Sequence, residues 1–188
     1  MQFNLPTFFT LLRIALIPGF VGVFLLPVKW ANTASAAMFG LAALTDWLDG
    51  YLARRWQQTS HFGAFLDPVA DKLMVAAALV LLVQAIPTPW MAIAAVVIIG
   101  REITISALRE WMAQIGSQAT VAVSMIGKLK TTAQMVALLL LLYREPLGMF
   151  PTRQVGLALL LIAAALTLWS MMRYLLAAWP IMQERMDA

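Results

Sequence analysis

The sequence has no cysteine and only one histidine, His61, among its 188 residues. Without cysteine the chain forms no disulfide and no cysteine-ligated metal site, and one histidine excludes a histidine-rich site. Any metal bound here must therefore have oxygen ligands. We expect His61 to lie in an exposed loop and to take no part in catalysis.

Charged residues are also scarce. They make up 12% of the chain, whereas hydrophobic residues make up 62% and the mean hydropathy is +0.84. Because a soluble domain is about half apolar and about a quarter charged, this composition predicts an integral membrane protein. The net charge of +4 suits a chain among anionic lipids and gives no reason to expect a nucleic-acid partner.

The N-terminal segment lacks a basic leader, and Arg13 interrupts its apolar run. This pattern does not fit a cleaved secretory signal, so we interpret the segment as the first membrane helix. Internal repeats and low-complexity tracts are absent as well. We therefore expect one domain that covers residues 1–188.

Six apolar runs are long enough to cross a hydrocarbon core about 30 Å thick, which takes roughly 20 helical residues. The runs cover residues 8–28, 34–56, 64–86, 90–112, 120–143 and 153–178. Turn-forming or polar residues separate them, at Pro27 and Lys29, Gln57 to Ser60, Pro87 to Pro89, Gly116 to Ser117, and Glu145 to Pro151. The predicted fold is an all-α bundle of six transmembrane helices.

Basic residues favour one side of this bundle. With a cytoplasmic N-terminus, ten of the thirteen fall on the cytoplasmic side, and only Lys29, Arg144 and Arg153 lie outside. This bias predicts that both termini are cytoplasmic. Eight of the nine acidic residues collect on the same side, although acidic residues do not drive topology. A polar cavity open to the cytoplasm accounts for their clustering.

Four aspartates lie close together in the sequence, and each is costly to place beside lipid. Asp46 and Asp49 share a stripe of the second predicted helix with Gly50 and Ala53, and Arg54 lies one turn beyond Gly50. Three further positions, Gly63, Asp67 and Asp71, repeat every four residues along the third predicted helix. The two stripes can face each other across the turn and direct four carboxylates at one point.

Such a cluster needs positive charge, because carboxylates about 6 Å apart repel by about 3 kcal/mol per pair at an effective dielectric near 20. Arg54, Arg55 and Lys72 are candidates for part of the compensation, and a purely structural salt-bridge network is one reading. Divalent cations compensate more directly, since Mg²⁺ binds one or two carboxylates together with substrate phosphate oxygens. Two such ions could share the cluster.

The spacing D-x2-D-G-x2-A-R-x8-G-x3-D-x3-D is met at every fixed position, from Asp46 to Asp71, and resembles the signature of the CDP-alcohol phosphotransferase family. The resemblance extends through REITISALREWMA and GKLKTTAQMVAL to the last predicted helix. It implies a bacterial inner-membrane enzyme, a homodimer among membrane lipids, that transfers a phosphatidyl group from CDP-diacylglycerol to an alcohol and releases CMP. It also implies dependence on Mg²⁺ or Mn²⁺.

The resemblance also implies roles for individual residues. Asp46, Asp49 and Asp67 would hold the metals, while Asp71 would contact a metal and serve as the general base. The CDP-diacylglycerol site would be lined by Thr7, Thr10, Gly50, Ala53, Arg54, Ser60 and Gly63. Thr7 stands where the family motif P-N-x-x-T-x-x-R usually has asparagine. The residue types fit this chemistry, because phosphoryl transfer needs a metal clamp, relief of charge on the leaving group and a proton acceptor.

The alcohol acceptor is predicted from the remaining basic residues. Arg101 and Arg109 lie two turns apart near the end of the fourth predicted helix, and Lys128 and Lys130 lie near the start of the fifth. A pocket made by these four would select a phosphorylated acceptor, which agrees with sn-glycerol 3-phosphate and disfavours serine. Snorkelling at the membrane interface is the alternative role for some of them, Arg109 in particular. Glu102 would orient Arg101 or bind a hydroxyl of the acceptor.

Two other functions stay open at this point. A synthase of the same family could use inositol phosphate or phosphatidylglycerol as acceptor. A divalent-cation transporter could also use an acidic cluster, but transporters tend to place ion sites near the membrane midplane. The crowding of the charges on one side favours the enzyme.

Overall fold

The computed structural model describes residues 5–56, 61–114 and 125–186, and every helix or strand assigned within these ranges is an α-helix. The helices are α1 (Leu5–Leu25), α2 (Trp30–Trp56), α3 (His61–Ala85), α4 (Pro89–Gln114), α5 (Met125–Tyr143) and α6 (Thr152–Met186). Each overlaps one of the six predicted spans, so the all-α prediction is confirmed for the described residues. His61 opens α3 rather than lying in a loop.

Local sequence explains several helix ends. Helix α1 stops at Leu25, two residues before Pro27, because a proline disfavours helical geometry in the residue before it. Helix α4 starts at Pro89, and the preceding Thr88 accepts a hydrogen bond from the backbone N–H of Met91 at 3.3 Å. Helix α6 runs eight residues beyond the predicted limit of 178, because the end of an apolar run does not itself stop a helix. The predicted breaks at 57–60 and 116–117 lie outside the described residues.

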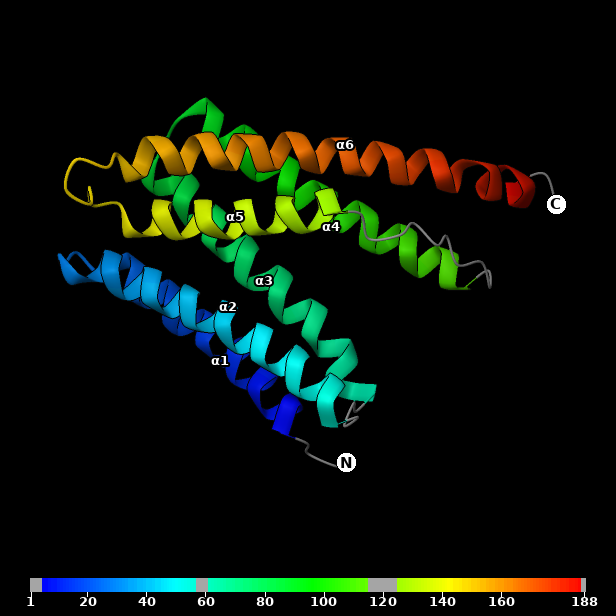
Figure 1. The fold of residues 1–188 in the computed structure, drawn as a ribbon, viewed down its shortest axis with the longest axis horizontal. Coiled ribbons are helices and arrows are strands. Elements are labelled where there is room, and N and C mark those ends of the chain that lie inside the picture. The colour runs from blue at the N-terminus through cyan, green and yellow to red at the C-terminus, as the bar shows by residue number, and fades with distance from the viewer. Residues whose placement is uncertain (1–4, 57–60, 115–124, 187–188) are drawn as a thin grey trace.

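The helices form two antiparallel pairs, which contact each other through α2 and α5, while α3 and α4 run behind α5 and α6 in this view (Figure 1). Helices α1 and α2 make one pair and α5 and α6 the other, while α3 packs on α1 and α4 packs on α6. Helices α5 and α6 approach closely at Gly156, where a Cβ atom would lie 2.9 Å from Leu141 Cγ. Any larger residue at this position would require the side chains of Leu140 and Leu141 to shift.

A continuous apolar core joins all six helices. Its fully buried members include Phe20, Phe39, Leu82, Met91 and Leu138. Large apolar side chains also cover much of the outside, such as Val96 at 72% exposed and Leu176 at 70%. By length and composition, α4 and residues Thr152–Pro180 of α6 can each cross a membrane. An apolar exterior of this kind suits a lipid environment.

The polar ends of the helices gather on one side of the molecule. The beginning of α1, the end of α2 and the beginning of α3 lie near one another, and the ends of α4 and α6 lie on the same side (Figure 1). The α5–α6 connection lies at the opposite end. The end of α2 and the beginning of α3, which carry the four predicted aspartates, therefore lie close together.

Candidate active site

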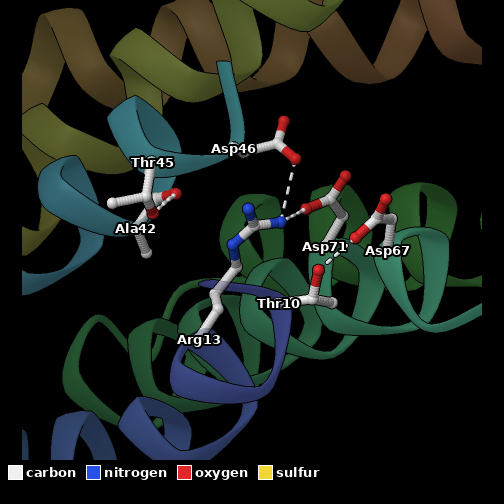
Figure 2. Close-up of polar contacts among 7 residues, drawn as sticks. All are labelled: Thr10, Arg13, Ala42, Thr45, Asp46, Asp67 and Asp71. Atoms are coloured by element: carbon white, nitrogen blue, oxygen red, sulfur yellow. Dashed lines mark hydrogen bonds and ion pairs between the residues drawn. The ribbon is translucent and has the colours of Figure 1, made fainter. Parts of the chain in front are cut away.

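Three helices bring the site together. Helix α2 contributes Asp46, and α3 contributes Asp67 and Asp71, one helical turn apart on the same face. Helix α1 contributes Thr10 and Arg13 (Figure 2). The predicted meeting of the stripes on α2 and α3 is therefore observed for the described carboxylates, with α1 as a third wall.

Arg13 lies between the two stripes. Its Nη1 donates to Asp46 Oδ1 at 2.8 Å and to Asp71 Oδ1 at 2.5 Å (Figure 2). The arginine side chain is 2% exposed, whereas the side chains of Asp46 and Asp71 are 42% and 45% exposed. The cation thus forms the floor of the site, and the carboxylates remain accessible above it.

Thr10 lies one turn before Arg13 on the same face of α1 and is fully buried. Its hydroxyl donates a hydrogen bond to Asp67 Oδ1. One face of α1 therefore binds three of the four predicted metal ligands. The sequence motif placed Thr10 at the nucleotide, and the structure adds a contact with the acidic cluster itself.

The structure adds a source of positive charge that the sequence did not predict. Of the three expected sources, Lys72 donates from its Nζ to Ser106 Oγ on α4, and the side chains of Arg54 and Arg55 lie outside the described part of the chain. Arg13 supplies compensating charge to Asp46 and Asp71, and sequence reasoning missed this role. The available signal was an arginine inside the apolar run of the first helix, where an unpaired charge is costly.

Two of the four predicted metal ligands, Asp46 and Asp71, converge on one point. Asp46 and Asp71 come from different helices and both bind one nitrogen atom, so their oxygens already converge on a single positive centre. Hard cations such as Mg²⁺ take oxygen ligands of this kind. Within the described residues, no group of three or more acidic, histidine or cysteine side chains is arranged to hold a metal. Asp49, the fourth predicted ligand, has its side chain outside the described part.

Several other predicted site positions also fall outside the description. The side chains at Thr7, Ala53, Arg54 and Lys128, the site environment of Gly50, and the whole of Ser60 are in this group. Gly63 is described and is buried in the first turn of α3. Its burial is consistent with the close approach that the sequence motif implied.

A second polar cluster joins α4 to α5. Arg101 Nη1 lies 2.6 Å from Glu102 Oε1, and Lys130 Nζ lies 3.9 Å from the same oxygen. Lys130 is buried, at 6% exposed. Two of the predicted acceptor residues are therefore brought together around one carboxylate. Arg109 is exposed and lies over the ring of Tyr174 on α6, 5.7 Å from its centroid.

A cavity of about 460 Å³ lies between α3 and α4. Its polar lining is Lys72, Glu102, Ser106 and Glu110, and the rest of its wall is apolar. Glu102 also belongs to the basic cluster, so the cavity adjoins that cluster. Its amphiphilic lining suits a molecule with a charged and an apolar part.

The fold and the site together define an all-helical protein with helices long enough for a membrane and with carboxylates gathered at one end. The chain belongs to the CDP-alcohol phosphatidyltransferase family, whose family model matches residues 3–169. This match covers all of the residues described above except Tyr174 and the last part of α6.

The similarity to individual proteins is more specific than the family match. The chain is 58% identical over 178 residues to the CDP-diacylglycerol–glycerol-3-phosphate 3-phosphatidyltransferase of Shigella flexneri serotype 5b. It is 57% identical to the proteins of the same name from Escherichia coli K12 and Salmonella typhimurium LT2. Each alignment covers 95% of this chain and 96% of the relative.

Proposed function

We propose that this chain transfers a phosphatidyl group from CDP-diacylglycerol to sn-glycerol 3-phosphate, giving phosphatidylglycerophosphate and CMP. The observation that carries the proposal is the convergence of Asp46 and Asp71 on one positive centre, in a chain 57–58% identical along nearly its whole length to transferases of that name. The reaction is a step of phospholipid biosynthesis.

The acidic cluster performs the transfer. Asp46, Asp49 and Asp67 hold two divalent ions, Mg²⁺ or Mn²⁺, with Asp71 as a further ligand. When bound, the ions neutralise charge on the pyrophosphate of the donor. Family membership supports this, since CDP-alcohol phosphatidyltransferases generally depend on divalent metals. Thr7, Thr10, Gly50, Ala53, Arg54, Ser60 and Gly63 line the donor site.

Asp71 is the general base. The free hydroxyl oxygen of the acceptor forms a bond to the lipid-linked phosphorus, and the bond from that phosphorus to the oxygen of CMP breaks. The hydroxyl proton passes to the Asp71 carboxylate. The exposure of this carboxylate above the buried Arg13 supports the role, because an entering alcohol can reach it.

The basic cluster binds the acceptor. Arg101 and Lys130 bind the phosphate of sn-glycerol 3-phosphate, with Lys128 beside them and Arg109 at the outer edge. Their shared partner, Glu102, holds them together in the structure. Two cations that share one carboxylate keep a net positive charge, which suits a phosphate, whereas serine has no phosphate to bind there.

The chain acts in the bacterial inner membrane. All six helices span the bilayer, both termini and the active site face the cytoplasm, and the enzyme is a homodimer. The apolar exterior, the positive-inside charge bias and the placement of the polar clusters on one side support this orientation. The amphiphilic cavity between α3 and α4 supports a lipid substrate.

An acceptor panel tests the proposal. Purified protein is supplied with CDP-diacylglycerol and Mg²⁺ or Mn²⁺ and with glycerol 3-phosphate, inositol phosphate, phosphatidylglycerol or serine, and CMP release is measured. We expect glycerol 3-phosphate to be preferred and chelation by EDTA to abolish turnover. A preference for another alcohol would reassign the acceptor, and activity after complete chelation would remove the metal mechanism. Metal flux into sealed vesicles without CMP release would instead indicate a transporter.

A further inference from the structure

The connection between α5 and α6 carries two arginines that have no part in the proposed reaction. It lies at the end of the molecule opposite the end of α2 and the beginning of α3 (Figure 1). Arg144 is the first residue after α5, and Arg153 is the second residue of α6. Both belong to the small group of basic residues that the sequence places outside the cytoplasmic side.

Arg144 has an unusual backbone conformation. Among the described residues it is the only non-glycine with a positive φ, at 61°. Its backbone N–H donates to the carbonyl oxygen of Leu140 at 3.2 Å, so it closes α5 in the left-handed position that glycine usually takes. An arginine pays a steric cost there that glycine avoids, and such outliers gather at binding sites. The strain therefore points to a use for the arginine side chain.

The guanidinium of Arg144 lies against α1. Its Cζ is 4.3 Å from the centroid of the Phe24 ring. Two of its nitrogens, Nε and Nη2, are buried and have no hydrogen-bond partner within the described part of the chain. An aromatic ring attracts the charge but accepts few of the five N–H donors of a guanidinium. The residue as a whole is only partly buried, so a ligand with strong acceptor oxygens can approach it from the surface.

Positive charge accumulates around this side chain. Burial lowers the pKa of Arg144, and the nearby charge of Arg153 lowers it further. A guanidinium nevertheless keeps its proton, so the two arginines repel each other. Glu145 is the next residue in sequence, but no ion pair joins it to either arginine in the described ranges. The N-terminus of α6 adds a partial positive charge beside Arg153. An anion is therefore favoured at this position.

Apolar side chains lie beside the arginines on the same connection. Leu147, Met149 and Phe150 are all exposed, although they are large and hydrophobic. The backbone holds them in place, because Phe150 N–H donates to Leu147 O at 3.0 Å and Thr152 Oγ1 donates to Glu145 O at 2.9 Å. A surface that joins cations to exposed apolar groups matches a lipid head group with its acyl chains.

We propose that Arg144 and Arg153 bind the phosphate of a phospholipid head group at the membrane surface, with Leu147, Met149 and Phe150 among its acyl chains. The inference rests on the proposed crossing of the bilayer by α5 and α6, and it concerns a lipid that is not a substrate. A free phosphate ion would use the arginines alone and would give the exposed apolar residues no role.

A purely structural arginine predicts a different outcome. If Arg144 only clamped the connection onto Phe24 of α1, its removal would lower the Tm by the same amount with and without added lipid. A head-group site predicts that removal also weakens lipid binding and reduces the rise of Tm that lipid produces. The lipid-dependent part of the change therefore separates the two roles.

The test titrates full-length protein, purified in detergent, with phosphatidylglycerol and measures bound lipid by native mass spectrometry and Tm by thermal denaturation. Diacylglycerol with the same acyl chains and inorganic phosphate are the comparison probes, and we expect both to bind at least about tenfold more weakly. Arg144→Gln should weaken phosphatidylglycerol binding about tenfold, the loss expected for one charge-assisted hydrogen bond. Arg153→Gln should weaken it about threefold, because this arginine is exposed.

Two further variants control for strain and for charge. Arg144→Gly removes the side chain and suits the positive φ, so it should lose lipid binding to the same extent as Arg144→Gln, and it decides alone if that variant does not fold. Arg173→Gln removes an exposed arginine from the distant part of α6, and its binding should stay within about twofold of the unchanged protein.

Phosphatidylglycerol binding that is unaltered in the Arg144 variants would overturn the inference. Equal binding of diacylglycerol would overturn recognition of the phosphate, and equal binding of inorganic phosphate would overturn the choice of a lipid. CMP release by the Arg144 variants should match that of the unchanged protein. Because lipid binding is measured without turnover, failure of the proposed reaction would leave this result standing.

Discussion

The acidic and the basic cluster differ in the sign of their charge and in how far apart in the sequence their paired residues lie. In the acidic cluster, Arg13 on α1 binds Asp46 and Asp71 on two other helices. In the basic cluster, the counter-charge of Arg101 is its sequence neighbour Glu102, at 2.6 Å, and Lys130 of α5 is 3.9 Å from the same oxygen. The first cluster is held by the packing of three helices, and the second mainly by a contact within α4.

This difference predicts different consequences of mutation. A change in the acidic cluster alters both the chemistry and the contacts among α1, α2 and α3. A change in the basic cluster alters the affinity for the acceptor and leaves the helix packing nearly intact. The division of labour between the clusters can be tested one residue at a time.

The largest effect is expected for Asp71→Asn. The amide accepts no proton, so kcat should fall by about a thousandfold, within the range for loss of a general base. Donor binding should survive, with the Kd for CDP-diacylglycerol changed by less than about threefold, because a base acts mainly in the transition state. CMP release measures the first quantity and equilibrium binding of the donor the second.

Asp46→Asn is the matched comparison, because Asp46 shares Arg13 with Asp71 and has no proposed role as a base. We expect this variant to lose donor binding together with turnover. Equal losses of donor binding in the two variants would mean that the roles of clamp and base are not separable.

The next effect concerns the acceptor. Lys130→Ala should raise the KM for glycerol 3-phosphate by about 30-fold, since truncating one partner of a buried charge pair costs about 2 kcal/mol or more. The KM for CDP-diacylglycerol should change by less than about twofold, because the donor lies at the other cluster. Steady-state kinetics with each substrate varied in turn gives both values. Lys128→Ala is expected to shift the two KM values in the same way.

Lys29→Ala serves as the control for charge, since Lys29 is an exposed lysine at the opposite end of the molecule. Its kinetics should match those of the unchanged protein. A rise in the donor KM rather than the acceptor KM in Lys130→Ala would place the donor, not the acceptor, at the basic cluster.

Glu102→Gln is expected to change the KM for glycerol 3-phosphate less than Lys130→Ala does, and to lower it rather than raise it. The carboxylate of Glu102 occupies the position between Arg101 and Lys130 where an acceptor phosphate would bind. Removing its charge should lower the KM for glycerol 3-phosphate by about threefold, in keeping with a partly exposed ion pair. An increase in this KM would show that Glu102 orients the basic side chains or binds the acceptor's hydroxyl.

The lengths of the hydrophobic runs were enough to predict the number and the approximate positions of the helices. Six helices were expected, and each overlaps an observed one, since a helix that crosses a bilayer needs a minimum number of apolar residues. The stripe that carries Asp67 and Asp71 was also predictable, because residues four apart share a helix face. Membrane crossing by all six helices remains a prediction.

The pairing of Arg13 was not predictable from local pattern. Its partners lie 33 and 58 residues away, and they meet only because α1 packs against α2 and α3. The direction of Lys72 was predictable in principle. A residue next to Asp71 points about 100° around the helix from it, which here turns Lys72 toward Ser106 on α4.

The smallest effect is expected at the edge of the basic cluster, for Arg109→Gln. Arg109 is exposed and contacts Tyr174, and an exposed cation–π contact contributes about 0.5–1 kcal/mol. The Tm should therefore fall by about 1–3 °C, and the KM for glycerol 3-phosphate should rise by less than about threefold. Arg109→Lys keeps the charge and loses the planar stacking group, so it separates attraction for the acceptor from packing on α6. A rise in KM as large as that of Lys130→Ala would show that Arg109 belongs to the acceptor site. The buried Lys130 and the exposed Arg109 would then contribute equally to acceptor binding.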